Sequence, residues 1–245
     1  MKIFLVGLTV IFCAFGLCTF AAPIFESDVI VSANGEIKLT FIGHGTLLIE
    51  YAGKVIHIDP WTKLADYKQL PKADLVLITH EHADHTDAAA VAEIKKEATQ
   101  IIYTEACAQS LPGGTIVKNG DVLEAFGMVI QALPAYNILH KRDNGEPFHP
   151  KGRGNAYLLT IDGRRILIGG DTENIEELKA LKEIDVAFLP MNLPYTMTPE
   201  MVADIALAMR PRILYPYHFG ETDTGKLVEL LKDQKEIEVR IRNMK

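Results

Sequence analysis

Short runs of branched apolar residues recur along the chain, and glycines or polar loops separate them. Runs of about four to eight such residues, bounded by turn-forming residues, are typical of β-strands. In the first half the expected strands are residues 37–42, 46–50, 54–58, 74–78 and 101–103. In the second half they are residues 128–133, 156–161, 165–168, 186–189 and 213–215.

Apolar residues at helical spacing predict helices between several of these strands. The expected helices are residues 87–98, 175–182, 199–209 and 226–231. Asp87 is the expected cap of the first helix, and Pro199 stands in the first turn of the third, where proline is favoured. The two halves are similar in style, and no linker separates them. This organisation predicts one α/β domain, in which two sheets pack face to face with helices outside.

The N-terminal segment has the composition of an export leader, because Lys2 is followed by a long apolar run. Residues 19–21 resemble the cleavage site of a signal peptide. We therefore expect a signal peptide over residues 1–21 and a mature domain over residues 22–245, periplasmic or secreted. The alternative is an uncleaved anchor, since the apolar run approaches the roughly 18 to 20 residues that span a bilayer.

Cleavage there removes Cys13 and Cys18 and leaves Cys107 alone, so the mature chain could form no intrachain disulfide. The whole chain carries 25 basic and 32 acidic residues, a formal net charge of −7. This balance opposes binding to a nucleic-acid backbone or to an anionic membrane surface. The expected partner is a small-molecule substrate, with no nucleic acid and no membrane after cleavage. The oligomeric state stays open.

The strongest chemical signal follows the expected strand at residues 74–78. The segment Thr-His-Glu-His-Ala-Asp-His, residues 79–85, holds three of the chain's eight histidines. A loop after a strand is where open α/β sheets place their ligands, and imidazoles with carboxylates suit Zn, Mn or Fe. The segment is not a zinc-protease helix, because Asp84 stands where His-Glu-x-x-His requires its second histidine. The segment predicts a different kind of metal site.

Two later strand ends also carry residues of the ligand type. Gly-Gly-Asp-Thr at residues 169–172 follows one strand, and Pro-Tyr-His-Phe-Gly at residues 216–220 follows another. Alone, the first is a common turn and the second is more typical of a structural histidine. Together with the histidine cluster, they make Asp171 and His218 candidates for further ligands.

These motifs resemble those of the metallo-β-lactamase superfamily, whose signature is His-x-His-x-Asp-His followed by a distant His, Asp and His. The chain looks most similar to the small UPF0173-type and ascorbate-phosphate-lactonase-like metal-dependent hydrolases. Further support comes from Phe-Ile-Gly-His-Gly-Thr at residues 41–46 and His-Ile-Asp-Pro at residues 57–60. The resemblance implies a four-layer αββα sandwich with one or two divalent metals between the upper sheet ends.

The resemblance also implies a role for each ligand. His80 and His82 would hold the first metal, whereas Asp84, His85 and His218 would hold the second. Asp171 would lie between the two metals, because a carboxylate can span cations roughly 3.5 to 4 Å apart. The expected metal is Zn, with Mn or Fe as alternatives. True β-lactamases of this fold commonly use cysteine in the Asp171 region, so antibiotic hydrolysis is disfavoured.

The chain departs from the family pattern at Asn137, where relatives carry a third histidine for the first metal. The replacement candidates are His149, His140, Asn137 itself and a water molecule. We favour His149, because neighbouring prolines and Phe148 indicate an ordered loop, whereas the residues after His140 are polar. If none of these completes the first site, a one-metal enzyme is the consequence.

Five residues are weaker candidates. His57 lies inside an expected strand and is assigned a structural role. His44 stands between two glycines, and the sequence leaves open whether it faces the site. Glu81 is expected to point away from the metals, and Tyr195 is a candidate substrate contact. Cys107 is expected to be a buried small residue and not a nucleophile.

The implied chemistry is attack by a metal-activated hydroxide, with Asp84 orienting the water and moving its proton. The leading hypothesis is an exported metal-dependent hydrolase of a small ester, lactone, thioester, amide or phosphodiester. One alternative is a metal-binding protein of this fold with little hydrolytic activity. Another is a nuclease or phosphodiesterase, which the acidic balance disfavours. The sequence does not name the substrate.

Overall fold

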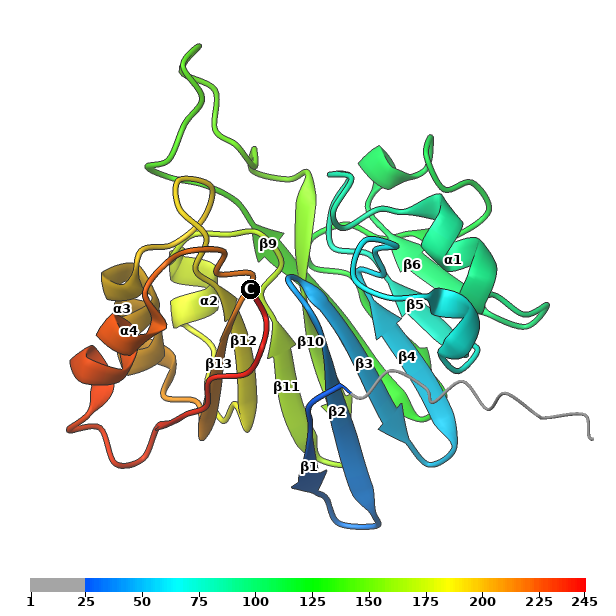
Figure 1. Cartoon of the computed structure of the whole chain (residues 1–245), viewed down its shortest axis with the longest axis horizontal. Coiled ribbons are helices and arrows are strands. Elements are labelled where there is room, and N and C mark those ends of the chain that lie inside the picture. The colour runs from blue at the N-terminus through cyan, green and yellow to red at the C-terminus, as the bar shows by residue number, and fades with distance from the viewer. Residues whose placement is uncertain (1–24) are drawn as a thin grey trace, which may run out of the picture.

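The computed structural model describes residues 25–245, and the expected signal peptide lies outside this range. Two seven-stranded sheets pack face to face (Figure 1). The first contains β1 (Ser27–Val31), β2 (Glu36–Gly43), β3 (Thr46–Tyr51), β4 (Lys54–Ile58), β5 (Leu75–Leu77), β6 (Gln100–Tyr103) and β7 (Thr115–Ile116), in that order. The second contains β8 (Val122–Ala125), β9 (Met128–Ala135), β10 (Gly154–Ile161), β11 (Arg164–Ile168), β12 (Val186–Pro190), β13 (Ile213–Tyr217) and β14 (Glu238–Val239), also in chain order.

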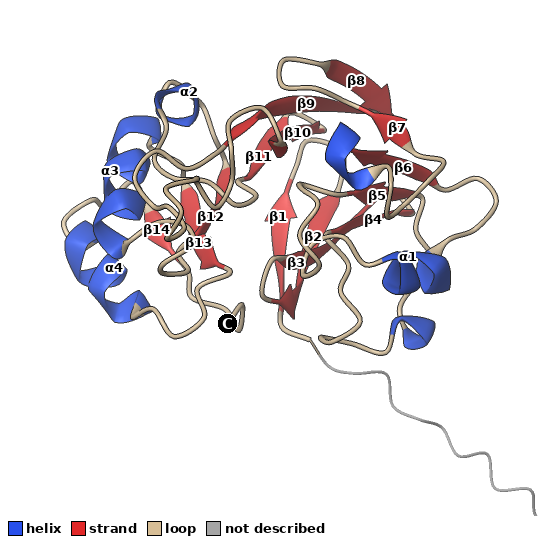
Figure 2. Ribbon diagram, turned by 90° about the horizontal axis from the view of Figure 1, so that it is seen from above, coloured by secondary structure: helices blue, strands red, loops and turns tan. Residues whose placement is uncertain are grey.

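The helices cover the outer faces of the two sheets. They are α1 (Ala88–Ile94), α2 (Glu176–Lys179), α3 (Pro199–Met209) and α4 (Thr224–Leu231), with short 3₁₀ turns η1 (Tyr67–Gln69) and η2 (Glu105–Cys107). Figure 2 shows α1 outside the first sheet and the other three α-helices outside the second. The layers therefore run helix, sheet, sheet, helix, which confirms the predicted αββα sandwich.

Apolar side chains from both sheets fill the space between them. Phe41 of β2 reaches across to Tyr215 of β13, with ring centroids 5.1 Å apart. Tyr215 in turn stacks on Phe188 of β12 at 4.9 Å. All three rings are at most 2% exposed. Full burial of one large apolar side chain contributes about 1.5–3 kcal/mol, so this interface is a main source of stability for the sandwich.

Strand order places the expected site at one end of the sandwich. In the first sheet β4, β5 and β6 run parallel, and in the second β11, β12 and β13 do so. The carboxyl ends of parallel neighbours meet at the same edge of a sheet. The loops that follow β5, β11 and β13 carry the three candidate metal motifs, and the fold therefore gathers them together.

Each expected strand is present, but β1, β7, β8 and β14 were not expected, and the bounds of three helices also differ from the expectation. Helix α3 has the expected bounds, and Asp87 caps α1 as expected by accepting from the amides of Ala89 and Ala90. However, α1 ends at Ile94 and not at residue 98, because Lys95 is extended and the Ile94 carbonyl accepts from Ala73. Helix α2 is likewise shorter than predicted. Within residues 25–245, no helix is both long and apolar enough to cross a membrane.

His57 has the structural position that its sequence context indicates. It lies fully buried in β4, where its Nε2 donates to the carbonyl of Pro71 at 3.0 Å and its Nδ1 has no partner. Burial lowers the pKa of His57 from 6.5 to about 4. In the unfolded chain His57 takes up a proton near pH 6.5, whereas in the folded chain it does so only near pH 4. The stability that neutral His57 contributes is complete above pH 6.5 and is lost as the pH falls toward 4.

This shift predicts a measurable pH dependence of folding. Between pH 7 and pH 5 the wild-type free energy of unfolding should fall by about 2 kcal/mol more than that of His57→Gln, which cannot titrate. Urea unfolding of both proteins, prepared with the same metal content, measures the difference. Parallel pH profiles for the two proteins would contradict the assignment.

Candidate metal centre

Asp59, directly after β4, holds the loop of residues 79–85 in place by hydrogen bonds. Its carboxylate accepts from the amide of Thr79 at 2.8 Å and from the Thr79 hydroxyl at 2.6 Å. The same carboxylate accepts from Nδ1 of His85 at 2.7 Å. This contact leaves Nε2 of His85 free to face the site, and a carboxylate behind a histidine is the usual support for a metal ligand. The motif at residues 57–60 did not by itself indicate this role of Asp59.

The loop itself folds into a tight turn that separates its histidines. The amide of His85 donates to the carbonyl of His82 at 2.9 Å, and the Thr86 hydroxyl donates to the carbonyl of His80 at 2.6 Å. His80 and His82 therefore face one side of the site, whereas Asp84 and His85 face the other. Two groups of potential ligands result, and each contains atoms within 4.8 Å of one another.

The first group consists of His80, His82, His149 and Asp171. Nε2 of His80 lies 3.1 Å from Nδ1 of His82, and Nε2 of His149 lies 3.1 Å from Oδ2 of Asp171. Nε2 of His80 is 3.8 Å from the same carboxylate oxygen. The structure thus brings His149, which is 5% exposed, into the same group as His80, His82 and Asp171.

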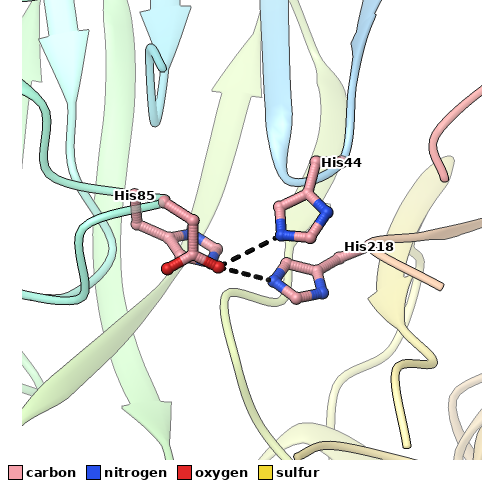
Figure 3. Close-up of side chains that lie close together, drawn as sticks. His44, His85 and His218 are labelled. Atoms are coloured by element: carbon pink, nitrogen blue, oxygen red, sulfur yellow. Dashed lines mark hydrogen bonds and ion pairs between the residues drawn. The ribbon is translucent and has the colours of Figure 1, made fainter. Parts of the chain in front are cut away.

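The second group consists of His44, Asp84, His85 and His218. Figure 3 shows the three histidines converging, with dashed lines from His44 and His218 to a carboxylate oxygen. That oxygen is Oδ2 of Asp84, at 3.1 Å from Nε2 of His44 and 3.4 Å from Nε2 of His218. His44, which the sequence left open, therefore faces the site.

Asp171 lies between the two groups and offers one oxygen to each. Its Oδ2 faces His149 and His80, as described above, whereas its Oδ1 lies 3.6 Å from Nε2 of both His85 and His218. Burial alone would raise the pKa of Asp171, but the surrounding histidines hold it well below its usual range. The carboxylate is therefore charged.

Several buried polar atoms at this point have no hydrogen-bond partner. They are Nε2 of His85, Nε2 of His218 and Oδ1 of Asp171. Leaving a buried polar group unsatisfied costs about 1–3 kcal/mol, and native proteins rarely do so without a reason. These atoms offer lone pairs toward a common space. A divalent transition metal fits this set of imidazole nitrogens and carboxylate oxygens.

Electrostatics at His85 point the same way. Burial lowers the pKa of His85, but the carboxylates of Asp171 and Asp59 outweigh burial and raise the pKa to about 9. Without a cation the site therefore favours a proton on His85. A metal ion supplies the positive charge that these carboxylates attract, and it competes with that proton for the same nitrogen.

Asn137 supports His149 in the site and does not face the metals. Its side-chain oxygen accepts from the amide of His149 at 2.7 Å and from Nδ1 of His149 at 2.8 Å. A carbonyl oxygen only accepts, so the proton sits on Nδ1 and Nε2 is left to face Asp171. Asn137 thus orients the imidazole of His149.

Glu173 fixes the loop that carries Asn137 and His149. Its buried carboxylate accepts from the amides of Ile138, Leu139 and His140 at 2.7–2.8 Å. The same carboxylate also accepts from the Asn137 amide group and from Nδ1 of His140. His140 consequently faces Glu173 and not the metal groups. Glu173 follows the Gly-Asp-Thr motif directly, but no pattern in the sequence indicated its role.

Gly45 lets the backbone pass close to the ring of His85, because a Cβ at residue 45 would lie 2.8 Å from Cε1 of His85.

The remaining candidates have clear positions. Glu81 turns away and pairs with Arg153 at 2.7 Å. Tyr195 lines a cavity of about 600 Å³ above both ligand groups. Cys107 is buried, and burial raises the pKa of its thiol, so it has no activated thiolate.

A family model for the β-lactamase superfamily domain matches residues 38–218, which span the candidate ligands. The chain belongs to this superfamily. It is 28% identical over 224 residues to a UPF0173 metal-dependent hydrolase of Pyrococcus abyssi, covering 83% of this chain and 96% of that protein. It is 31% identical to a UPF0173 metal-dependent hydrolase of Thermococcus onnurineus, covering 82% and 95%.

Solved structures agree with this assignment. A candidate metal-dependent hydrolase of Parabacteroides distasonis is 46% identical, with a TM-score of 0.86 over 91% of this chain and all of that one. Igni18, a metallo hydrolase of Ignicoccus hospitalis, is 26% identical, with a TM-score of 0.69 over 84% and 94%. The predicted resemblance and the predicted enzyme class are confirmed: the chain is a metal-dependent hydrolase of the metallo-β-lactamase superfamily.

Proposed function

We propose that the enzyme hydrolyses a small ester, lactone, thioester, amide or phosphodiester with two divalent cations. The observation that carries the proposal is the set of partnerless buried atoms on His85, His218 and Asp171. In this assignment the imidazoles of His80, His82 and His149 would hold the first cation. Asp84, His85 and His218 would hold the second, and Asp171 would be available to both. Zinc suits this ligand set, and Mn or Fe are alternatives.

When bound, such a metal pair supplies a water of lowered pKa and positive charge for a developing oxyanion. Asp84 then has the position of the proton acceptor, because it lies at the cavity and its side chain is 32% exposed. Burial acts to raise the pKa of Asp84, but the neighbouring imidazoles of His218 and His44 hold it well below its usual range. The carboxylate is therefore ionised and can orient a water by accepting a hydrogen bond from it.

The structure weakens the reason for the non-hydrolytic alternative. That alternative rests on an incomplete first site, and His149 supplies a third imidazole there at 3.1 Å from Asp171. The net charge of −7 continues to disfavour a nuclease.

Two matched histidine variants test the proposal. Wild-type protein should contain one to two transition-metal ions, and His149→Ala should lower both metal content and turnover. His140→Ala should change neither by much, because His140 faces Glu173. Elemental analysis measures the ions, and a panel of esters, lactones, thioesters and phosphodiesters measures turnover.

Chelation supplies the second measurement. Removal of metal should abolish hydrolysis of every compound in the panel that the enzyme hydrolyses. Addition of at least one kind of divalent metal should restore this hydrolysis. Hydrolysis that survives complete metal removal would contradict the proposed mechanism. Full activity and metal content in His149→Ala would remove His149 from the ligand set.

A further inference from the structure

Resting on the hydrolytic function proposed above, we propose that the substrate is a small organic anion. Its carboxylate or phosphate group binds between Lys63 and Arg142, and its apolar body lies against Trp61 and Phe148. All four residues line the cavity above the candidate ligands. The inference names the substrate class and residues that determine specificity outside the metal centre.

The cavity has the size of a small-molecule site. Its volume is about 600 Å³, and ligand pockets typically measure roughly 300–1,000 Å³. Its lining includes His82, Asp84, His149, Asp171 and His218, so a molecule bound there reaches the proposed metals. The rest of the lining comes from separate loops and is unusually rich in cations and aromatic rings.

The two cations are held in place by aromatic rings. The ammonium of Lys63 lies 4.9 Å from the centroid of Trp61, and the guanidinium of Arg142 lies 5.1 Å from that of Phe148. Such cation–π contacts stabilise an exposed cation by about 0.5–1 kcal/mol without neutralising it. Arg142 also donates to the carbonyl of Phe148 at 3.4 Å, a long contact that leaves most of its donors available.

Neither cation is paired with a carboxylate anywhere in residues 25–245. Other cations, such as Lys151 and Arg153, are paired with carboxylates. The acidic groups that face the cavity, Asp84 and Asp171, belong to the candidate metal groups. The charges of Lys63 and Arg142 therefore remain available to an anion that enters the cavity.

Aromatic side chains make up much of the remaining wall. Phe148 packs edge-on against Tyr195 with centroids 5.0 Å apart, and Trp61 lies 5.2 Å from the His44 ring. Flat apolar surfaces of this kind bind a planar or apolar body, whereas the cations orient its charged group. The combination favours an organic anion over a small inorganic anion or a cationic ligand.

The chain provides its own binding probe, because Trp61 is its only tryptophan. We would titrate metal-loaded protein with hydrocinnamate, with its neutral amide and with phenylphosphonate, following Trp61 fluorescence. Both anions should half-saturate the signal at concentrations at least about tenfold below the amide. The carboxylate and phosphonate arms show which anionic group is preferred.

Variants that remove one positive charge distinguish anion binding by Lys63 and Arg142 from anion binding by the metals. Lys63→Gln and Arg142→Gln should each weaken anion binding about threefold, and the double variant about tenfold, as expected for exposed ion pairs. Binding of the amide should not change. Lys141→Gln removes the same charge next to Arg142, outside the cavity lining, and should leave all three titrations unchanged. Equal binding of anion and amide, or equal losses in Lys141→Gln and the double variant, would overturn the inference.

Turnover distinguishes this inference from the proposed function. The para-nitrophenyl monoester of glutarate and para-nitrophenyl butyrate form an anionic and a neutral pair. The double variant should raise KM for the anionic ester about tenfold and leave kcat and the neutral ester unchanged. If neither ester is hydrolysed, with or without chelator, the proposed hydrolytic function is wrong. Anion-selective changes in Trp61 fluorescence would still support the anion-binding site. If both esters are hydrolysed equally well, hydrolysis stands and the anionic substrate class is wrong.

Discussion

Asp171→Asn should remove most of the bound metal and lower kcat/KM by roughly a thousandfold. Loss of a residue that merely supports a metal ligand typically costs about 10–100-fold, and a ligand shared by two cations should cost more. Asp171 is that shared ligand in the proposed assignment, since its two oxygens face separate groups of histidines. Asparagine keeps the shape of the side chain but removes the charge that lies between four imidazoles.

Elemental analysis and turnover of the purified variant measure these effects. Asp74→Asn is the matched control, because Asp74 is also a buried carboxylate but pairs with Lys96 at the opposite end of β5. The control should lose some stability and keep its metal. An Asp171→Asn protein that retains both ions and at least a tenth of the wild-type activity would contradict the shared-ligand assignment.

The core of the candidate site could be predicted because its geometry follows from short spacings and strand ends. His80, His82 and His85 lie within six residues, so a single turn brings them together. Asp171 and His218 are distant in sequence, yet each follows a strand of a parallel set, and such strand ends meet at one edge. The four-layer arrangement was predictable from the same alternation of strands and helices.

Other parts of the site depend on contacts that exist only in the folded chain. Asp59 and Glu173 belong to neither group of candidate ligands. Each acts through hydrogen bonds to a loop from elsewhere in the sequence. Loop composition favoured His149 over His140, but the sequence alone does not decide between them. Glu173 draws His140 away and, through Asn137, directs His149 inward. No local pattern encodes that division.

Helix ends show the same limit on a smaller scale. The cap of α1 could be predicted from the sequence, because Asp87 accepts hydrogen bonds from amides only two and three residues ahead. The end of α1 was not visible, because the carbonyl of Ile94 is taken by Ala73 from a distant loop. Local signals thus located the start of α1, whereas a tertiary hydrogen bond determined where it ends.

Glu173→Gln should lower metal occupancy and turnover although Glu173 faces neither ligand group. Both carboxylate oxygens accept hydrogen bonds, and the amide nitrogen of glutamine would meet N–H donors in place of an acceptor. Hydrogen bonds to a buried charge contribute about 1.5–3 kcal/mol each, so the loop over residues 137–149 should lose its fixed conformation. Without it, His149 no longer holds its place beside Asp171.

The expected pattern is specific to the first site. Glu173→Gln should lose up to one metal ion and about 10–100-fold in kcat/KM, as is typical for residues that orient ligands. Added metal should partly restore turnover, because the remaining ligands are intact. Glu177→Gln is the matched control, since Glu177 lies four residues on and pairs with exposed Lys151. If Glu173→Gln keeps the metal content and activity of Glu177→Gln, the loop holds His149 without Glu173, and the positioning role is wrong.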